Sequence, residues 1–152
     1  MSIEYLNRDL TSFRYGLIAH GTNCMGKMGR GVAAGIRKQW PEAYDRYLTI
    51  TPDKKLLGTV QFVEIRPTTL TIANCFTQVF YGVGGRFADP KAIDSCVQEL
   101  FKYAYFGHLP LYMPKIGCGL GGLKWDEVLP ILEKHQRFVP DARVFVCDIN
   151  KG

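Results

Sequence analysis

Short apolar runs alternate with amphipathic segments along most of the chain. Runs rich in β-branched and aromatic residues predict strands, which cover residues 2–6, 15–20, 59–65, 70–76, 109–116 and 142–149. Apolar residues spaced three and four apart predict helices over residues 31–40, 90–107 and 126–138. The order of these elements is β, β, α, β, β, α, β, α, β. An alternating order of this kind predicts one mixed sheet with helices on both faces.

Local signals indicate where the helices begin and end. Asp89 is placed as an N-cap, with Pro90 at the first helical position. Gly107 stands where a C-terminal glycine is expected. Pro41 either ends the first helix or starts a second one with the sequence PEAYDRYL. Pro130 is expected in the first turn of the last helix, the part of a helix that tolerates proline.

Length and composition narrow the class of protein. The 152 residues suit one domain, and we found no repeats or linker. The net charge of +5 comes from scattered Lys and Arg, so no patch for sequence-independent nucleic-acid binding is predicted. Five cysteines without C-x-x-C spacing are typical of reduced thiols that are buried or lie in loops. No stretch has membrane-span length or the apolar block of a signal peptide, so we expect a cytoplasmic protein.

Two glycine clusters each connect a predicted strand to a predicted helix. One lies in GTNCMGKMGRGVAAGI (21–36) and the other is GCGLGG (117–122). The turn from a strand into a helix offers free backbone N–H groups and a positive dipole end to an anion. Two such turns in one domain indicate a paired clamp for a diphosphate; the alternative is that the glycines only form tight turns. Neither cluster matches the P-loop or the dinucleotide-binding fingerprint.

The segments EYLNRDL (4–10), HGTNCMGKMGRGVA (20–33) and MPKIGCGLGGLKW (113–125) together resemble the macrodomain family. The resemblance implies a single macrodomain over residues 1–152, with a three-layer α/β/α fold and no cofactor. It implies that ADP-ribose or its 1''-phosphate is the ligand. His20-Gly-Thr-Asn23-Cys24 is similar to the yeast-type ADP-ribose 1''-phosphate phosphatases. GCGLGGLKW looks equally like macrodomains that remove ADP-ribose from DNA bases or protein carboxylates, and a non-catalytic reader is a third alternative. Nucleic acid is expected only as an ADP-ribosylated substrate, and we expect a monomer.

The same resemblance assigns roles to individual residues. Asp9 would accept a hydrogen bond from the adenine amino group, or would be only a cap or turn former. Asn23 would bind the distal ribose hydroxyls. Backbone N–H groups from both glycine clusters would bind the two phosphates. The complete set of implied ligand-binding residues is Asp9, Leu10, Asn23, Gly29, Arg30, Gly31, Val32, Phe80, Gly117, Cys118, Gly119, Leu120, Gly121 and Gly122.

Catalysis is assigned to Asn23 and His20, either of which would orient a water for attack on the 1''-phosphate. His20 has two interpretations, as an acid/base near the ribose or as a packed side chain bonded to backbone. Cys24 and Cys118 flank the predicted site, but no basic neighbour marks either one as a nucleophile. No spacing of His, Cys and Asp indicates a metal site.

Some positions depart from the family pattern. Gln78 follows Thr77 where the base- and carboxylate-cleaving macrodomains commonly carry lysine, and Gly121 stands where those proteins can carry aspartate. A lysine-dependent glycosyl cleavage is therefore not expected. Cys147 replaces an adenine-stacking tyrosine, which leaves Ile149 or a loop aromatic to cover the ring. The aromatic residues of QVFYGVGGRF, namely Phe80, Tyr81 and Phe87, either form a lip over a ribose or pack the loop.

Overall fold

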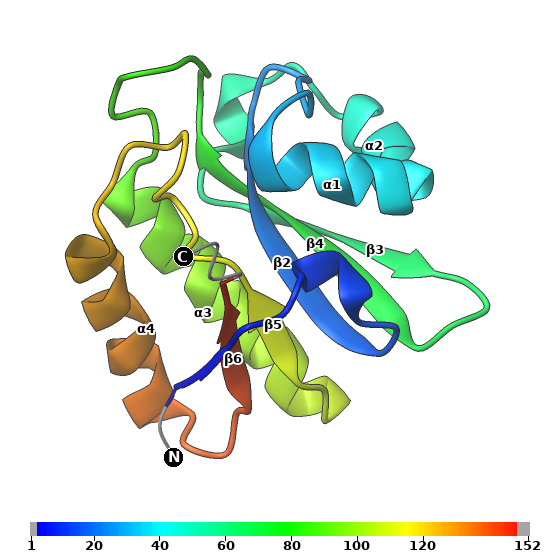
Figure 1. The fold of residues 1–152 in the computed structure, drawn as a ribbon, viewed down its shortest axis with the longest axis vertical. Helices are drawn as coiled ribbons and strands as arrows, with labels where there is room; N and C mark the ends of the chain where they lie inside the picture. Colours follow the sequence, from blue (N-terminus) through cyan, green and yellow to red (C-terminus); the bar gives the residue numbers. More distant parts are fainter. Residues whose placement is uncertain (1–2, 149–152) are drawn as a thin grey trace.

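A six-stranded sheet lies between two pairs of helices in the computed structural model, which describes residues 3–148 (Figure 1). The strands are β1 (Glu4–Leu6), β2 (Gly16–Asn23), β3 (Val60–Ile65), β4 (Leu70–Gln78), β5 (Leu111–Met113) and β6 (Val144–Cys147). The helices are α1 (Gly31–Gln39), α2 (Pro41–Leu48), α3 (Pro90–Gly107) and α4 (Trp125–Phe138), with 3-10 helices η1 (Leu10–Ser12) and η2 (Lys54–Leu56). The predicted three-layer α/β/α fold is confirmed.

The sheet has the strand order β1-β6-β5-β2-β4-β3. All neighbouring strands are parallel except β3 and β4, which form an antiparallel pair. The carboxyl ends of β2, β4 and β5 therefore meet at one edge of the sheet. Both glycine clusters follow strands of this group, so the topology brings them together at the edge where open α/β sheets bind ligands.

Alternation along β2 divides the core between the two faces of the sheet. Leu17 packs into a cluster with α3 and α4, which includes Leu100 and Leu132. The next residue, Ile18, belongs to the cluster on the opposite face, which includes Ile36 of α1. Because successive strand residues point to opposite faces, one strand of apolar residues serves both helical layers.

Several predicted boundaries differ from those in the structure. β2 continues to Asn23 instead of ending at His20, so the predicted site residue Asn23 belongs to a strand. The left-handed residue that ends α3 is His108, with φ of 54°, and not Gly107. Pro41 starts a second helix, as one alternative predicted. Pro130 is the sixth residue of α4 and lies in its second turn, where one backbone hydrogen bond is missing.

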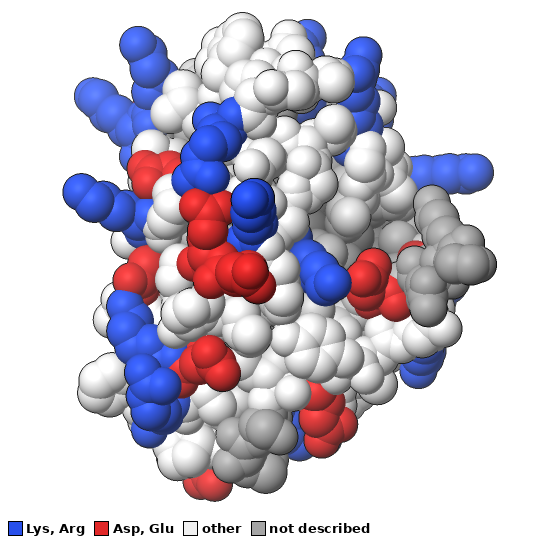
Figure 2. All heavy atoms as spheres, turned by 60° about the vertical axis from the view of Figure 1, so that its left-hand side comes forward, with Lys and Arg blue, Asp and Glu red and all other residues white. Residues whose placement is uncertain are grey.

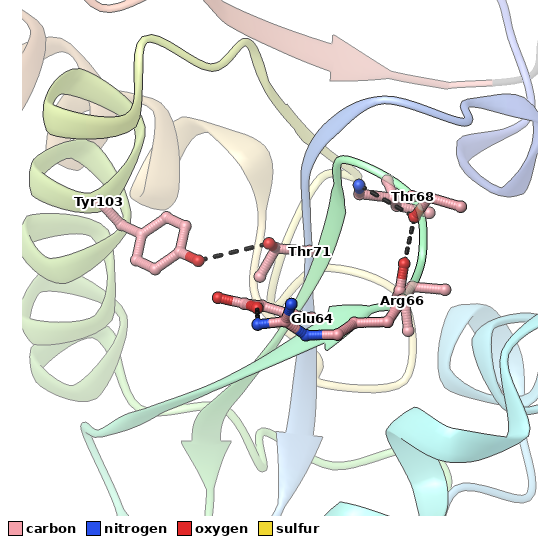
Figure 3. Close-up of polar contacts among 7 residues, drawn as sticks. Glu64, Arg66, Thr68, Thr71 and Tyr103 are labelled. Atoms are coloured by element: carbon pink, nitrogen blue, oxygen red, sulfur yellow. Dashed lines mark hydrogen bonds and ion pairs between the residues drawn. The ribbon is translucent and has the colours of Figure 1, made fainter.

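The turn between β3 and β4 lies at the amino end of β4, at the opposite end of this strand from the glycine clusters. Arg66 pairs with Glu64 at 2.6 Å between Nη2 and Oε2, and the hydroxyl of Thr68 donates to the carbonyl of Ile65 (Figure 3). A hollow of about 430 Å³ beside this turn is lined by residues 64 and 66–71. Its one cation, Arg66, is already paired with a carboxylate, so this hollow has no free charge to attract an anion.

Charges of both signs are mixed over the face that carries α4 (Figure 2). Arg86 pairs with Glu127 at 2.9 Å, and Lys134 pairs with Asp94. The five cysteines are free thiols, four of them buried, as predicted. Between residues 3 and 148, no helix is long and apolar enough to cross a membrane.

Candidate functional site

A cavity of about 780 Å³ opens between the two glycine clusters. Its volume lies in the range of small-molecule sites. Its floor includes the carboxyl ends of β2 and β4, and its walls are the loop before α1 and the loop after β5. Ten of the predicted site residues line it: Asn23, Gly29, Arg30, Gly31, Val32, Gly117, Cys118, Gly119, Leu120 and Gly121.

The wall formed by the first loop ends in the exposed amino terminus of α1. Arg30 is the N-cap residue, but its side chain caps no backbone N–H, and the first turn holds no acidic residue. Gly29 has open space where a Cβ would lie, and Gly119 on the facing wall is equally open. Uncapped N–H groups at a helix start, with the positive end of the helix dipole, favour an anion at this position.

The second glycine cluster is partly used for packing against the loop that precedes α3. A Cβ on Gly122 would lie 2.0 Å from the carbonyl oxygen of Gly85, and its φ is +82°. The carbonyl of Gly121 accepts hydrogen bonds from the N–H groups of Phe87 and Ala88, at 2.9 and 3.0 Å. Gly122 does not line the cavity. Its predicted place around a phosphate is therefore not supported, because its missing side chain makes room for another loop.

Among residues 3–148, four cations and no acidic residue line the cavity; the cations are Lys27, Arg30, Arg37 and Lys115. Lys115 pairs with Asp148 at 3.3 Å. Within residues 3–148, the other three cations have no ion-pair partner. Unpaired cations around a cavity raise the local concentration of anionic ligands. Sequence reasoning missed Lys27, Arg37 and Lys115 as site residues, although the alternation of glycine and cation in MGKMGRG points to the first.

Asn23 holds the first glycine loop in shape. Its Oδ1 accepts hydrogen bonds from the N–H groups of Met25 and Lys27 and lies 2.9 Å from the hydroxyl of Tyr47. Its Nδ2 donates to the Lys27 carbonyl at 2.8 Å, which leaves one amide hydrogen for a ligand. Because Oδ1 is already occupied, it is poorly placed to accept a hydrogen from an attacking water. The role that this geometry permits for Asn23 is that of a donor.

Tyr47 of α2 lies beneath this loop and was not predicted as part of the site. Its fully buried hydroxyl accepts hydrogen bonds from the N–H groups of Gly26 and Lys27, both at 3.1 Å, and donates to the carbonyl of Asn23 at 2.7 Å. Burial raises the pKa of Tyr47 to about 12. The hydroxyl therefore keeps its proton at neutral pH. The only sequence signal for this role is that Tyr47, whose side chain ends in a hydroxyl group, lies on the buried face of α2 with Ala43.

His20 lies in the core and does not line the cavity. Its Nε2 is 2.6 Å from Oδ1 of Asn74, whose Nδ2 donates to the Ala43 carbonyl and to Gln61. Burial lowers the pKa of His20 to about 4, so the ring is neutral at physiological pH. This placement argues against the acid/base alternative and favours a packed side chain. The hydrogen-bond partner of the ring is the side-chain amide of Asn74, whereas the sequence interpretation expected the backbone.

Comparison with protein families matches residues 19–132 to the Macro domain. The chain belongs to the macrodomain family. It is 31% identical to an uncharacterized 17.5 kDa protein of Enterobacteria phage T4, covering 89% of this chain and 90% of the relative. It is 28% identical to the ADP-ribose 1''-phosphate phosphatase of Meyerozyma guilliermondii, and the match covers 88% of this chain and 94% of that enzyme. A solved macrodomain protein of Streptomyces coelicolor superposes with a TM-score of 0.79 at 25% identity. The match covers 97% of this chain and 99% of that protein.

The adenine end expected for this macrodomain lies on the β1 side of the sheet. Asp9 is exposed and is the N-cap of η1, and its Oδ1 accepts hydrogen bonds from the N–H and the hydroxyl of Thr11, both at 2.8 Å. These bonds lower the pKa of Asp9 below its ordinary value. Leu10 is buried, and neither residue lines the cavity. The cap alternative is confirmed, and the adenine contact stays a prediction. Cys147 is buried, and Ile149 lies outside the described residues.

The three aromatic residues of the segment QVFYGVGGRF differ in their positions relative to the cavity. Tyr81 lines the cavity, whereas Phe80 stacks on it at 4.9 Å between ring centroids and lies outside the lining. Phe87 packs across Gly82 and Gly85, within 3.0 Å of where each Cβ would lie. Tyr81 therefore has the position predicted for Phe80, and Phe87 packs the loop.

Gln78, Cys118 and Cys24 do not offer an activated nucleophile. The Nε2 of Gln78 donates to the carbonyl of Phe80 at 2.8 Å. Burial raises the pKa of Cys118, which lines the cavity, and raises that of Cys24 to about 11. Both thiols are thus protonated at neutral pH, and the sequence-based expectation that neither is a nucleophile agrees with this chemistry.

Proposed function

We propose that this macrodomain binds ADP-ribose derivatives and hydrolyses ADP-ribose 1''-phosphate to ADP-ribose and phosphate. The observation that carries the proposal is the cavity itself, whose lining in the described part of the chain combines open backbone at Gly29 and Gly119 with three unpaired cations and no carboxylate. A ligand with several phosphate charges fits this combination. The similarity to a yeast enzyme named ADP-ribose 1''-phosphate phosphatase supports the choice among such ligands.

The ligand would lie along the carboxyl edge of the sheet. The adenine would lie on the β1 side near Asp9, and the diphosphate between Gly29–Gly31 and Gly119–Leu120. The distal ribose would then reach the ends of β2 and β4, where the remaining amide hydrogen of Asn23 donates to a ribose hydroxyl or phosphate oxygen. Neighbouring cations would stabilise the phosphate charge, because electrostatic stabilisation is a large term in phosphoryl transfer.

The reaction requires only water as a second substrate. The water oxygen forms a bond to phosphorus while the bond between phosphorus and the 1''-oxygen breaks. The proton lost by the water passes to a phosphate oxygen and then to the departing 1''-oxygen of the ribose. No histidine, aspartate or glutamate lines the cavity in residues 3–148, so the substrate's own phosphate serves as the proton carrier.

Phosphate release from ADP-ribose 1''-phosphate tests the enzymatic part of the proposal. The protein is incubated with this compound, with ADP-ribosylated protein and with ADP-ribosylated DNA, and each product is quantified. We expect phosphate from the first substrate and little release of ADP-ribose from the others. Fast cleavage of either macromolecular substrate, with the 1''-phosphate untouched, would show that the reaction is wrong. Calorimetry tests the binding part, since ADP-ribose should bind more tightly than AMP or NAD.

Non-catalytic binding of ADP-ribose is the second candidate. It is favoured by the same lack of a histidine, aspartate or glutamate among the described cavity residues. Calorimetric binding of ADP-ribose without product from any of the three substrates would select this candidate. Equal affinity for AMP and ADP-ribose would contradict both candidates, because the second loop would then contribute nothing to binding.

A further inference from the structure

Lys27, Arg37 and Tyr44 form a group on one side of the cavity, and the contacts proposed for the adenine, the diphosphate and the distal ribose hydroxyls involve none of them. All three line the cavity. The guanidinium carbon of Arg37 lies 3.9 Å from the centroid of the Tyr44 ring, a cation–π contact. Neither Lys27 nor Arg37 has an ion-pair partner within residues 3–148. Two cations are thus left for a ligand at this side.

The strand order shows which end of the ligand this group would meet. Tyr44 belongs to α2, which packs against β3 and β4 at one edge of the sheet (Figure 1). Asp9 follows β1, which is the strand at the opposite edge. The end of β2, with Asn23, lies between them. A ligand whose adenine is near Asp9 therefore has its distal ribose toward Lys27, Arg37 and Tyr44.

The ring of Tyr44 and the backbone of Lys27 both contact the buried Tyr47. Tyr44 packs on Tyr47 at 6.2 Å between ring centroids, and the hydroxyl of Tyr47 accepts a hydrogen bond from the N–H of Lys27. The contact with the Tyr44 ring limits the positions that the guanidinium of Arg37 adopts. A planar guanidinium held in this way is suited to bidentate contact with phosphate oxygens.

We propose that Lys27 and Arg37 form a second anion subsite, which binds a phosphate monoester attached to the distal ribose. The inference rests on the proposed function, since it takes ADP-ribose to occupy the cavity. The diphosphate is bound by glycine backbone, whereas this terminal group is bound by side-chain cations. A phosphate monoester carries up to two negative charges near neutral pH, which two otherwise unpaired cations would match. Tyr44 is a positioning residue that acts through Arg37.

Calorimetry with two ligands tests the subsite. One is ADP-ribose, and the other is the phosphonate analogue of ADP-ribose 1''-phosphate, in which a methylene group replaces the bridging oxygen and prevents hydrolysis. Arg37→Gln should weaken binding of the phosphonate by roughly tenfold, the scale of one charged hydrogen bond, and that of ADP-ribose by less than about twofold. Lys38→Gln is the matched control, because this neighbouring exposed lysine does not line the cavity and should change neither affinity.

The role of Tyr44 is tested by two substitutions in the same assay. Tyr44→Leu should reduce the preference for the phosphonate, and Tyr44→Phe should retain it, because only the ring face contacts Arg37. Thermal melts of each variant distinguish a loss of folding from a loss of the subsite. Equal weakening of both ligands in Arg37→Gln, or no weakening of either, overturns the subsite. Wild-type protein that binds ADP-ribose with no preference for the phosphonate overturns the subsite alone, whereas a failure to bind ADP-ribose contradicts the proposed function itself.

Discussion

Removing the Tyr47 hydroxyl should destabilise the protein and weaken ligand binding together. Tyr47→Phe keeps the ring in the core but deletes the acceptor for the N–H groups of Gly26 and Lys27 and the donor to the Asn23 carbonyl. The two N–H groups are only partly buried and regain water, whereas the backbone of Asn23 is buried. The loss of these hydrogen bonds, one of them to a buried carbonyl, should lower the free energy of unfolding by about 1–3 kcal/mol.

Thermal unfolding followed by circular dichroism measures this loss. For a chain of this length, the melting temperature should fall by about 3–9 °C. Calorimetry should show weaker ADP-ribose binding, because the loop that carries Gly29 is no longer fixed. Tyr105→Phe is the matched control, since the half-exposed Tyr105 does not line the cavity, and its melting temperature should stay within about 1 °C of wild type.

The outcome for Tyr47→Phe is decisive in both readouts. An unchanged melting temperature and an unchanged affinity would refute the inference that this hydroxyl organises the loop. Burial raises the pKa of Tyr47 from 10.0 to about 12, so the protonated hydroxyl contributes fully below the unfolded value. The contribution is lost only as the pH rises through the folded value. The difference between wild type and Tyr47→Phe should therefore be constant across neutral pH.

Three further changes test other parts of the molecule. Burial lowers the pKa of His20 from 6.5 to about 4, so the unfolded chain binds the proton first as the pH falls. The free energy of unfolding from urea titrations should fall by about 3 kcal/mol between those two pH values, and the slope should flatten in His20→Gln. An identical slope in both proteins would refute this. Gly119→Glu should abolish ADP-ribose binding while Gly119→Ala retains it, because the position is open but faces the predicted phosphates. Calorimetric binding by the Glu variant would contradict the placement of the diphosphate. Asp9→Ala should weaken ADP-ribose binding by about 1–3 kcal/mol, while Asp53→Ala, which removes the equivalent cap of η2, should not. Equal affinities in these two variants would leave Asp9 as a cap only.

The main elements of the fold could be predicted because local pattern and topology agree. Buried β2 and β4 appear in the sequence as continuous apolar runs, and α3 shows helical spacing behind the Asp89-Pro90 start. The 3-10 helices could not be predicted, since three residues carry no periodic signal. The left-handed end of α3 at His108 was missed because glycine is the usual residue there and one stood next to it.

The parts of the site that consist of glycine-rich backbone could be predicted from the sequence. The parts that depend on contacts between helices could not. The two glycine clusters marked both walls of the cavity, and ten of the predicted residues line it. Arg37 was missed because it lies in the last turn of α1, and Tyr44 because it lies in the middle of α2; both side chains meet at the cavity only after these helices pack together. Gly122 was assigned to a phosphate because the sequence cannot distinguish a glycine that faces a ligand from one pressed against another loop.

The contact between Gly122 and Gly85 restricts how these two segments can vary in evolution. A side chain at position 122 fits only if the backbone of the loop before α3 moves away. That loop is hydrogen-bonded through its N–H groups to the carbonyl of Gly121. Substitutions in either segment should therefore be inherited as a pair. In diverged relatives, loss of the glycine at position 122 should accompany a change of length in the aromatic segment QVFYGVGGRF. The two loops should therefore change together when the cavity changes in evolution.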